Sequence, residues 1–392
     1  MLDFVYHVPT KIVFGRKAEE KAGELCRECG AHRVLLHYGG RSAQASGLIG
    51  RVRDSLERAG LGCVELGGAV PNPRLSKVRE GRDLALREGV DLILGVGGGS
   101  AIDSAKAIAY AAAEPGKDVW ELFARRRKAE GCLPVGAIPT IAAAGSEMSN
   151  SCVISNDATG EKRSYNDDIA RPRFAAMDPE LTMTLPAWQT ASGCADILMH
   201  TMERYFTNGG NMDLTDALAE GLLRTVMRCA LILRDDPHDY DARAEVMWAG
   251  SLSHNGLTGC GCRSDFASHM IEHELGGMFD VTHGAGLTAV WGSWARYVFR
   301  NCLPRFEKFA LRVMEVEPGA GAEETALRGI AAMEGFFRSI GLPVDLEGLG
   351  VSPTDGQIEQ MARSAAEGAG GGKGSAMFLR GPDIAAILRM AR

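Results

Sequence analysis

The sequence predicts two domains, an α/β domain with a parallel sheet followed by a mainly helical domain. The chain has 392 residues, more than one ordinary hydrophobic core usually holds. Strand-like apolar runs alternate with helical patterns in the first half, whereas from about Pro186 only long helical patterns follow. Prolines punctuate the chain between Asp178 and Pro186. We therefore expect domains at residues 1–185 and 186–392.

In the first half, short apolar runs and turn residues mark strands, and amphipathic stretches mark helices. The expected strands cover residues 11–15, 33–38, 63–66 and 91–96. The expected helices between them cover residues 17–29, 47–59 and 75–88. This alternation favours parallel strands joined by helical crossovers.

In the second half, the hydrophobic period is helical throughout. The expected helices cover residues 188–206, 214–233, 242–255, 264–275, 286–297, 304–316, 323–340 and 383–392. The stretch 370–375 superficially resembles a phosphate-binding Walker loop, but its glycine spacing fails and no strand precedes it. We interpret it as a flexible loop.

Composition excludes several classes of protein. The formal net charge of -7 gives no electrostatic basis for a nucleic-acid partner. No uncharged apolar run approaches the ~18 residues of a membrane span. The ten cysteines are scattered, the pair Cys26 and Cys29 has no partner motif, and the start of the chain is not a signal peptide. A reducing cytoplasm without disulfides is the expected compartment.

A glycine loop is the clearest feature of the first half. Gly97, Gly98, Gly99 and Ser100 follow a strand and open a helix. Backbone without Cβ atoms can approach a phosphate, and the helix N-terminus supplies free N–H groups. Ser100 replaces the third glycine of the usual dinucleotide fingerprint, so a plain tight turn is the alternative. Three consecutive glycines exceed what such a turn needs, which favours a pyrophosphate ligand.

Two helical pairs suggest a metal site in the second half. His269 and His273 are one turn apart, as are Asp196 and His200, so each pair can share a helix face. Carboxylate and imidazole ligands from separate helices suit a divalent transition metal. Histidines at the edge of a core, with ordinary hydrogen bonds, are the alternative.

A later histidine is expected to join these pairs. Gly276 and Gly277 loosen the helical pattern, and His283 follows just before another glycine. A helix that breaks at these glycines could turn the chain back and bring His283 to the same point.

Together these features resemble the iron-containing (group III) alcohol dehydrogenase family, along nearly the whole chain. The branch they resemble is that of NADP-dependent aldehyde reductases and butanol dehydrogenases. Supporting stretches lie at residues 38–42, 71–73, 97–106, 145–150, 178–186 and 203–205. The resemblance implies a Rossmann-like dinucleotide-binding domain and an all-α metal-binding domain, in an architecture like that of dehydroquinate synthase, with the active site in the cleft between them.

The resemblance also implies site residues. The implied ligands of one divalent metal, Fe²⁺ or Zn²⁺, are Asp196, His200, His269 and His283. His273 would lie beside the metal as a catalytic proton relay. The implied cofactor-binding residues are Gly39, Gly40, Ser42, Asn72, Gly97, Gly98, Gly99, Ser100, Asp103, Thr140, Ser146, Lys162, Leu181 and Thr182. Ala144 stands where relatives often carry threonine, so one cofactor hydrogen bond is absent from this pattern.

The implied activity is reversible hydride transfer between NADP(H) and a primary alcohol or aldehyde, in a cytoplasmic homodimer. One alternative is a dehydroquinate-synthase-like lyase, which needs many cations for a phosphorylated acidic substrate. Only Arg204 and Arg263 lie near the histidines in the sequence. A non-catalytic, metal-stabilised assembly module is the other alternative, and it leaves the glycine loop unexplained.

The strand at residues 33–38 bears on the choice of nucleotide. A carboxylate at the end of such a strand binds the ribose 2′-hydroxyl of NAD and repels a 2′-phosphate. This chain has Gly39, Gly40, Arg41 and Ser42 there, with no Asp or Glu in residues 31–48. A plain turn with an exposed arginine is the alternative. We expect NADP(H) to be preferred over NAD(H).

Overall fold

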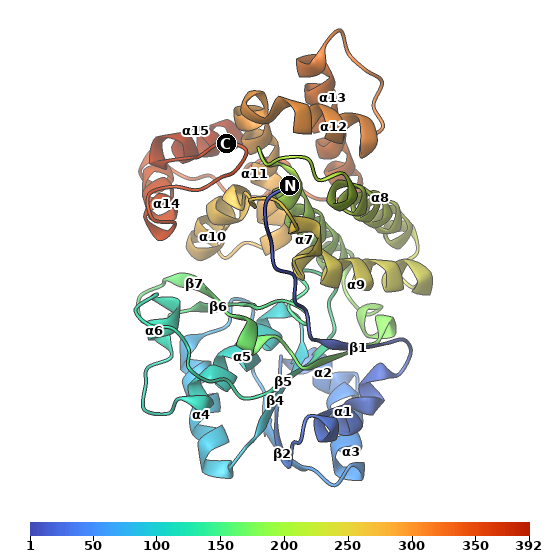
Figure 1. The fold of residues 1–392 in the computed structure, drawn as a ribbon, viewed down its shortest axis with the longest axis vertical. Helices are drawn as coiled ribbons and strands as arrows, with labels where there is room; N and C mark the ends of the chain where they lie inside the picture. The colour runs from blue at the N-terminus through green and yellow to red at the C-terminus, as the bar shows by residue number, and fades with distance from the viewer. The chain divides into compact units, whose positions relative to one another are not determined.

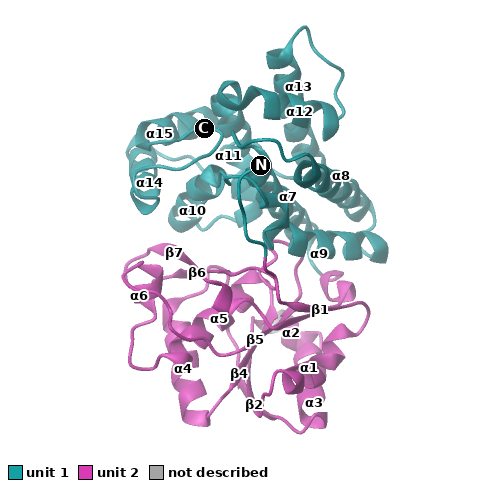
Figure 2. Cartoon of the chain, viewed as in Figure 1, with its two compact units in different colours: residues 1–6, 185–392 teal, residues 7–184 magenta. Residues whose placement is uncertain are grey.

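The structure is a computed structural model that describes the backbone of residues 1–392 and every side chain except those of Arg41 and Ser42. It contains two compact units (Figure 2). Residues 7–184 form the first, here the α/β unit, and residues 1–6 with 185–392 form the second, here the helical unit. The glycine loop belongs to the α/β unit and the histidine pairs belong to the helical unit.

A six-stranded sheet forms the centre of the α/β unit, in the order β1-β8-β5-β4-β2-β3. All its strand pairs are parallel, as the sequence predicted. The strands are β1 (Lys11–Phe14), β2 (Arg33–Tyr38), β3 (Gly62–Leu66), β4 (Leu92–Gly97), β5 (Val135–Pro139) and β8 (Phe174–Met177). Strands β5 and β8, which are short and lie between irregular segments, were not predicted from the sequence.

Helices cover both faces of this sheet because successive strand residues point to opposite faces. Val34 and Leu36 pack with one core cluster, which includes residues of α1 (Ala22–Glu28) and α3 (Leu48–Arg58). Leu35, between them, packs with another cluster, which includes residues of α4 and α5. Those helices cover Leu75–Glu88 and Gly99–Ala113. In Figure 1, α4 lies on one side of β2 and β4, and α1 and α3 lie on the other. Continuous apolar strands are thereby buried on both faces.

Smaller elements complete the α/β unit. They are η1 (Ala18–Lys21), α2 (Arg41–Ala45), α6 (Trp120–Phe123), β6 (Ser151–Ser155), β7 (Lys162–Asn166), η2 (Asp168–Ala170) and η3 (Pro179–Thr182). Strands β6 and β7 form a separate antiparallel hairpin.

The helical unit contains nine α-helices among the described residues. They are α7 (Ala187–Tyr205), α8 (Asp213–Asp235), α9 (Tyr240–His254), α10 (Ala267–Phe279), α11 (His283–Val298), α12 (Leu303–Arg312), α13 (Ala322–Ser339), α14 (Asp355–Gly368) and α15 (Gly381–Ala391). Short 3₁₀ turns lie at η4 (Leu257–Gly259) and η5 (Phe299–Cys302). Helix α11 is central, since it packs against α7, α10, α13 and α15 and is buried almost throughout.

Two predictions about this unit were wrong in detail. Helix α10 does not break at Gly276 and Gly277 but continues to Phe279, and the left-handed backbone of Asp280 (φ 52°) follows it. Glycine costs only about 1 kcal/mol in a helix, which the burial of neighbours such as Leu275 can offset. Helix α11 begins at His283 rather than at residue 286. Helix α14 was not predicted.

Among the described residues, no helix is long and apolar enough to cross a membrane. The ten cysteines are free thiols.

Candidate metal centre and nucleotide site

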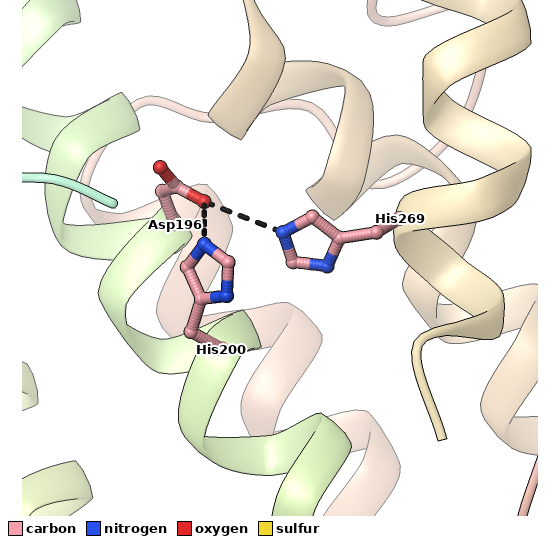
Figure 3. Close-up of side chains that lie close together, drawn as sticks. All are labelled: Asp196, His200 and His269. Atoms are coloured by element: carbon pink, nitrogen blue, oxygen red, sulfur yellow. Dashed lines mark ion pairs between the residues drawn. The ribbon is translucent and has the colours of Figure 1, made fainter. Parts of the chain in front are cut away.

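One carboxylate oxygen is the meeting point of three imidazoles in the helical unit. Oδ1 of Asp196 lies 3.4 Å from Nε2 of His200. The same oxygen lies 3.6 Å from Nε2 of His269 and 3.6 Å from Nε2 of His283. Figure 3 shows Asp196 and His200 on one helix, α7, and the ring of His269 reaching them from another. The four residues predicted as metal ligands therefore lie together.

Local helix geometry explains the convergence. Asp196 and His200 are one turn apart on α7, so they share a face. Helix α11 approaches α7 very closely beside His283, because a Cβ on Gly284 would lie 2.0 Å from the carbonyl oxygen of Ser192. Glycine next to His283 thus lets α11 begin against α7, which brings the His283 ring to Asp196.

The donor set fits a divalent metal. Asp196, His200 and His269 are all at most 5% exposed. Oδ1 of Asp196 and Nε2 of His269 have no hydrogen-bond partner among the described residues, although both are buried. Buried polar atoms without partners are uncommon and call for an explanation. Three imidazole nitrogens and one carboxylate oxygen are ligands that Zn²⁺ and Fe²⁺ both accept.

Two further carboxylates, Glu203 and Glu272, lie behind the rings. Glu203 Oε2 bonds Nδ1 of His269, and Glu272 Oε2 bonds Nδ1 of His283. Sequence reasoning missed both as site residues. For Glu203 a signal was available, since it lies seven residues after Asp196 on the same face of α7. Such carboxylates orient the imidazoles that bind metals in many proteins.

Burial and charge act in opposite directions on the pKa values of the rings. Burial lowers the pKa of His269, but the Glu203 and Asp196 carboxylates outweigh it and raise that pKa to about 10. Burial, reinforced by His254 and His269, lowers the pKa of His200 well below its ordinary value. The carboxylates therefore favour positive charge at this point, whether a proton or a metal ion carries it.

His273, the predicted catalytic residue, lies beside the cluster. Its ring centroid is 5.8 Å from that of His283 and 6.3 Å from that of His269. Ligand atoms of Glu272, His273 and His283 lie within 4.8 Å of one another, which makes a second group able to hold a cation. His273 is partly exposed, whereas His269 is buried. The ring of His273 can therefore exchange protons with water.

In the α/β unit, most predicted cofactor residues follow the carboxyl ends of the parallel strands. Gly39 and Gly40 follow β2, Asn72 follows β3, Gly97 to Ser100 end β4 and open α5, Thr140 follows β5, and Leu181 and Thr182 follow β8. In this sheet β3 lies on the outer side of β2, whereas β5 lies on the opposite side, next to β4. The order of the strands therefore changes direction between β2 and β4, which makes that position the topological switch point. Ligands of open α/β sheets bind at this edge, at such switch points.

The glycine loop is built for close backbone approach. Gly97 has φ 147°, which side chains rarely adopt, and a Cβ there would lie 2.9 Å from that of Ala101. A Cβ on Gly98 would lie 2.9 Å from Ile141, whereas nothing lies within 4 Å of one on Gly99. Helix α5 begins without a side-chain cap, which leaves its first N–H groups to a ligand. The backbone N–H of Thr140 donates to Gly97 O at 2.9 Å and joins β5 to the loop.

Asp103 and Ser146 lie together in a polar network beside this loop. Ser146 Oγ donates to Asp103 Oδ1 at 2.5 Å, and the buried Lys106 donates to Ser146 O at 2.7 Å. Burial raises the pKa of Asp103, although Lys106 opposes the shift. Burial lowers the pKa of Lys106. The network fixes residues 146–151, since Lys106 also donates to the carbonyl oxygens of Ser149 and Ser151.

Other predicted cofactor residues are placed less directly. Lys162 begins β7, on the hairpin rather than on the main sheet, and pairs with Ser155. Thr182 is buried and its hydroxyl already donates to Pro179 O at 2.8 Å, within its own turn. Leu181 packs partly on the core of the sheet. The side chain of Ser42 lies outside the described residues.

Comparison with known proteins bears on both halves of the chain. Residues 9–179 match the family model of iron-containing alcohol dehydrogenase, and residues 190–391 match that of the Fe-containing alcohol dehydrogenase family, C-terminal. The chain is 36% identical to NADH-dependent butanol dehydrogenase A of Clostridium acetobutylicum over 390 residues, 99% of each protein. It is also 36% identical over 355 residues to the NADPH-dependent aldehyde reductase YqhD of Escherichia coli, 90% of each.

A solved structure agrees with these matches. The crystal structure of NADH-dependent butanol dehydrogenase A from Thermotoga maritima is 38% identical and superposes with a TM-score of 0.95, over 100% of this chain and 99% of that one.

Proposed function

We propose, since the chain belongs to the iron-containing alcohol dehydrogenase family, that it is a metal-dependent oxidoreductase of primary alcohols and aldehydes with NADP(H) as its nucleotide. The observation that carries this proposal is the convergence of three Nε2 atoms on Oδ1 of Asp196. Relatives whose names give butanol dehydrogenase and aldehyde reductase activities supply the substrate class.

The reaction balances as hydride and proton transfer. In the direction of reduction, aldehyde, NADPH and H⁺ would give a primary alcohol and NADP⁺, and the nucleotide would supply the hydride that the carbonyl carbon receives. Asp196, His200, His269 and His283 would hold a divalent ion, Fe²⁺ or Zn²⁺, whose Lewis acidity would polarise the carbonyl. His273, partly exposed beside them, would exchange the proton between the alcohol oxygen and water through its imidazole.

Charge near the metal centre supports a neutral substrate. Arg204 Nη1 donates to His200 O at 2.5 Å, and its guanidinium lies 4.8 Å from the centroid of the Phe266 ring. These contacts hold Arg204 within the protein, where it does not serve an acidic substrate. A lyase acting on a phosphorylated acid is therefore the weaker proposal.

Space at the end of β2 supports NADP(H). A Cβ on Gly39 would meet only Ala69 O, at 3.7 Å, and one on Gly40 would meet nothing within 4 Å. Gly68 N–H donates to Gly39 O at 3.3 Å, and a Cβ on Gly68 would lie 3.6 Å from Nζ of Lys77. Nζ of Lys77 pairs with Glu80 Oε2 at 2.6 Å, so the support for a 2′-phosphate comes from the room at Gly39 and Gly40. Relatives include proteins named for NADH and for NADPH, so the choice within the family is a property of each chain.

A substrate and nucleotide screen on anaerobically purified protein tests this function. We expect NADPH to be oxidised in the presence of short-chain aldehydes such as butanal. NADPH added without an aldehyde should raise the melting temperature of the protein. If no aldehyde or primary alcohol turns over with either nucleotide, and neither nucleotide raises the melting temperature, the proposal is wrong. Light scattering on the same preparation checks the proposed homodimer.

A further inference from the structure

We propose that Glu203 and Glu272 are positioning residues that align two imidazoles of the metal centre, each helix bracing a ring on the next. Helix α7 carries Asp196 and Glu203, and Glu203 bonds His269 of α10. Helix α10 in turn carries Glu272, which bonds His283 of α11. The inference rests on the proposed function only in that the cluster binds a metal.

Glu203 holds both the ring and the backbone of His269. Its side chain is 1% exposed, and Oε2 contacts Nδ1 of the ring. Its Oε1 accepts the backbone N–H of His269 at 3.0 Å. That N–H belongs to the first turn of α10, which begins at Ala267, so no carbonyl of the helix is available to it. Because a carboxylate only accepts, Nδ1 carries a hydrogen, which leaves Nε2, the atom that faces Asp196, as the one that would bind a metal.

Glu272 holds the ring of His283, and the sequence leaves room for the Glu272 side chain. Its side chain is 0% exposed, and Oε2 contacts Nδ1 of His283. A Cβ on Gly286, one turn along α11, would lie 3.0 Å from Cγ and 3.2 Å from Oε1 of Glu272. Glycine at 286 therefore admits the Glu272 side chain against α11.

In the part of the chain that the structure describes, no such carboxylate is seen to bond the ring of His200, so the arrangement concerns only His269 and His283. Nδ1 of His200 has no hydrogen-bond partner among the described residues. The ring instead stacks on His254, with centroids 4.1 Å apart and an interplanar angle of 21°. His200 shares α7 with Asp196, so its position relative to that carboxylate is set by the helix itself. The carboxylate braces serve the two rings that come from other helices.

Zinc affinity, measured by competition with a chromogenic chelator, tests the proposal on the full chain. Glu203→Gln and Glu272→Gln keep the side-chain shape and remove one acceptor oxygen. We expect each to weaken Zn²⁺ binding by about 10- to 100-fold, with a melting temperature of the metal-free protein close to that of the wild type. Glu220→Gln is the control. Glu220 is also buried but accepts from the hydroxyl of Tyr205, 2.9 Å away, so its replacement should leave Zn²⁺ affinity unchanged.

A fourth variant keeps both carboxylates. Gly286→Ala adds a methyl group that displaces Glu272, while alanine itself suits a helix. Gly286→Ala should weaken Zn²⁺ binding as Glu272→Gln does. The double variant Gly286→Ala with Glu272→Gln should lose no more Zn²⁺ affinity than either single variant, because both substitutions disturb the same contact. Glu203→Gln with Glu272→Gln should instead lose the product of the two effects.

The outcomes separate the inference from the proposed function. Zn²⁺ affinities within twofold of the wild type for both glutamine variants would overturn the bracing role while leaving the metal centre intact. A wild-type protein that binds no Zn²⁺ would overturn the metal centre together with the braces.

Discussion

Oδ1 of Asp196 lies 3.6 Å from Nε2 of His269, although the two residues come from α7 and α10. Neither atom has a hydrogen-bond partner among the described residues. This arrangement would suit a metal ion bound by both atoms. Nε2 of His200, on the same helix as Asp196, lies 3.4 Å from that oxygen, and Nε2 of His283 lies 3.6 Å from it. The convergence of the three imidazoles on Oδ1 is the basis of the metal-centre proposal.

Removal of single imidazoles should separate a ligand from a proton relay. His269→Ala removes a proposed ligand, so the protein should purify with little metal and little activity. His273→Ala should keep its metal and turn over about 10²- to 10⁴-fold more slowly, the usual contribution of a general acid or base. Metal analysis and kcat measured on the same preparations check both. The roles are assigned wrongly if His273→Ala purifies empty and His269→Ala full.

The close approach of α11 to α7 should be sensitive to one methyl group. Gly284→Ala would place a Cβ 2.0 Å from Ser192 O, a backbone atom that cannot move aside alone. We expect a loss of about 1–3 kcal/mol or more in the free energy of unfolding, together with weaker metal binding. Gly277→Ala is the control, because nothing lies within 4 Å of a Cβ there. It should stabilise the helix by up to about 1 kcal/mol. Urea denaturation of both variants measures this, and equal stabilities would contradict it.

The glycine loop should tolerate no branched side chain. In Gly98→Val the Cβ alone would lie 2.9 Å from Ile141, and the methyl groups would occupy the path by which a phosphate approaches the backbone. NADPH binding should fall at least 10-fold, while the metal content, which depends on the helical unit, stays unchanged. Nucleotide titration of the folded variant decides this. Unchanged affinity would remove the loop as the pyrophosphate site.

Nucleotide choice should change with one carboxylate. Gly39→Asp introduces an acceptor for the ribose 2′-hydroxyl and a charge that repels a 2′-phosphate. We expect the ratio of kcat/KM for NADPH to that for NADH to exceed one in the wild type and to fall at least 10-fold in the variant. A clear preference of the wild type for NADH would mean that the end of β2 does not select NADP(H).

Sequence reasoning succeeded where short-range periodicity decides the structure. The alternation of apolar runs such as 33–38 with helical patterns predicted the parallel sheet, and the glycine loop ends a strand and opens a helix as expected. One-turn spacing predicted that Asp196 and His200 would share a face, as they do.

Sequence reasoning failed where packing between residues far apart in the sequence decides the structure. Helix α10 continues past Gly276 and Gly277 because the burial of neighbours such as Leu275 offsets the low helix propensity of glycine. Glu203 and Glu272 resemble ordinary helix-surface carboxylates in the sequence, because the rings that they bond lie on other helices. Only the packed structure shows which imidazole each of them bonds.

The most direct test of the metal-dependent mechanism is the rate of NADPH oxidation with butanal after metal removal and replacement. The protein is stripped with a chelator under anaerobic conditions, assayed, and assayed again after addition of one equivalent of Fe²⁺ or Zn²⁺. We predict that stripping abolishes the activity and that one equivalent of at least one of the two ions restores it. Undiminished activity in protein shown to be free of metal would contradict the account.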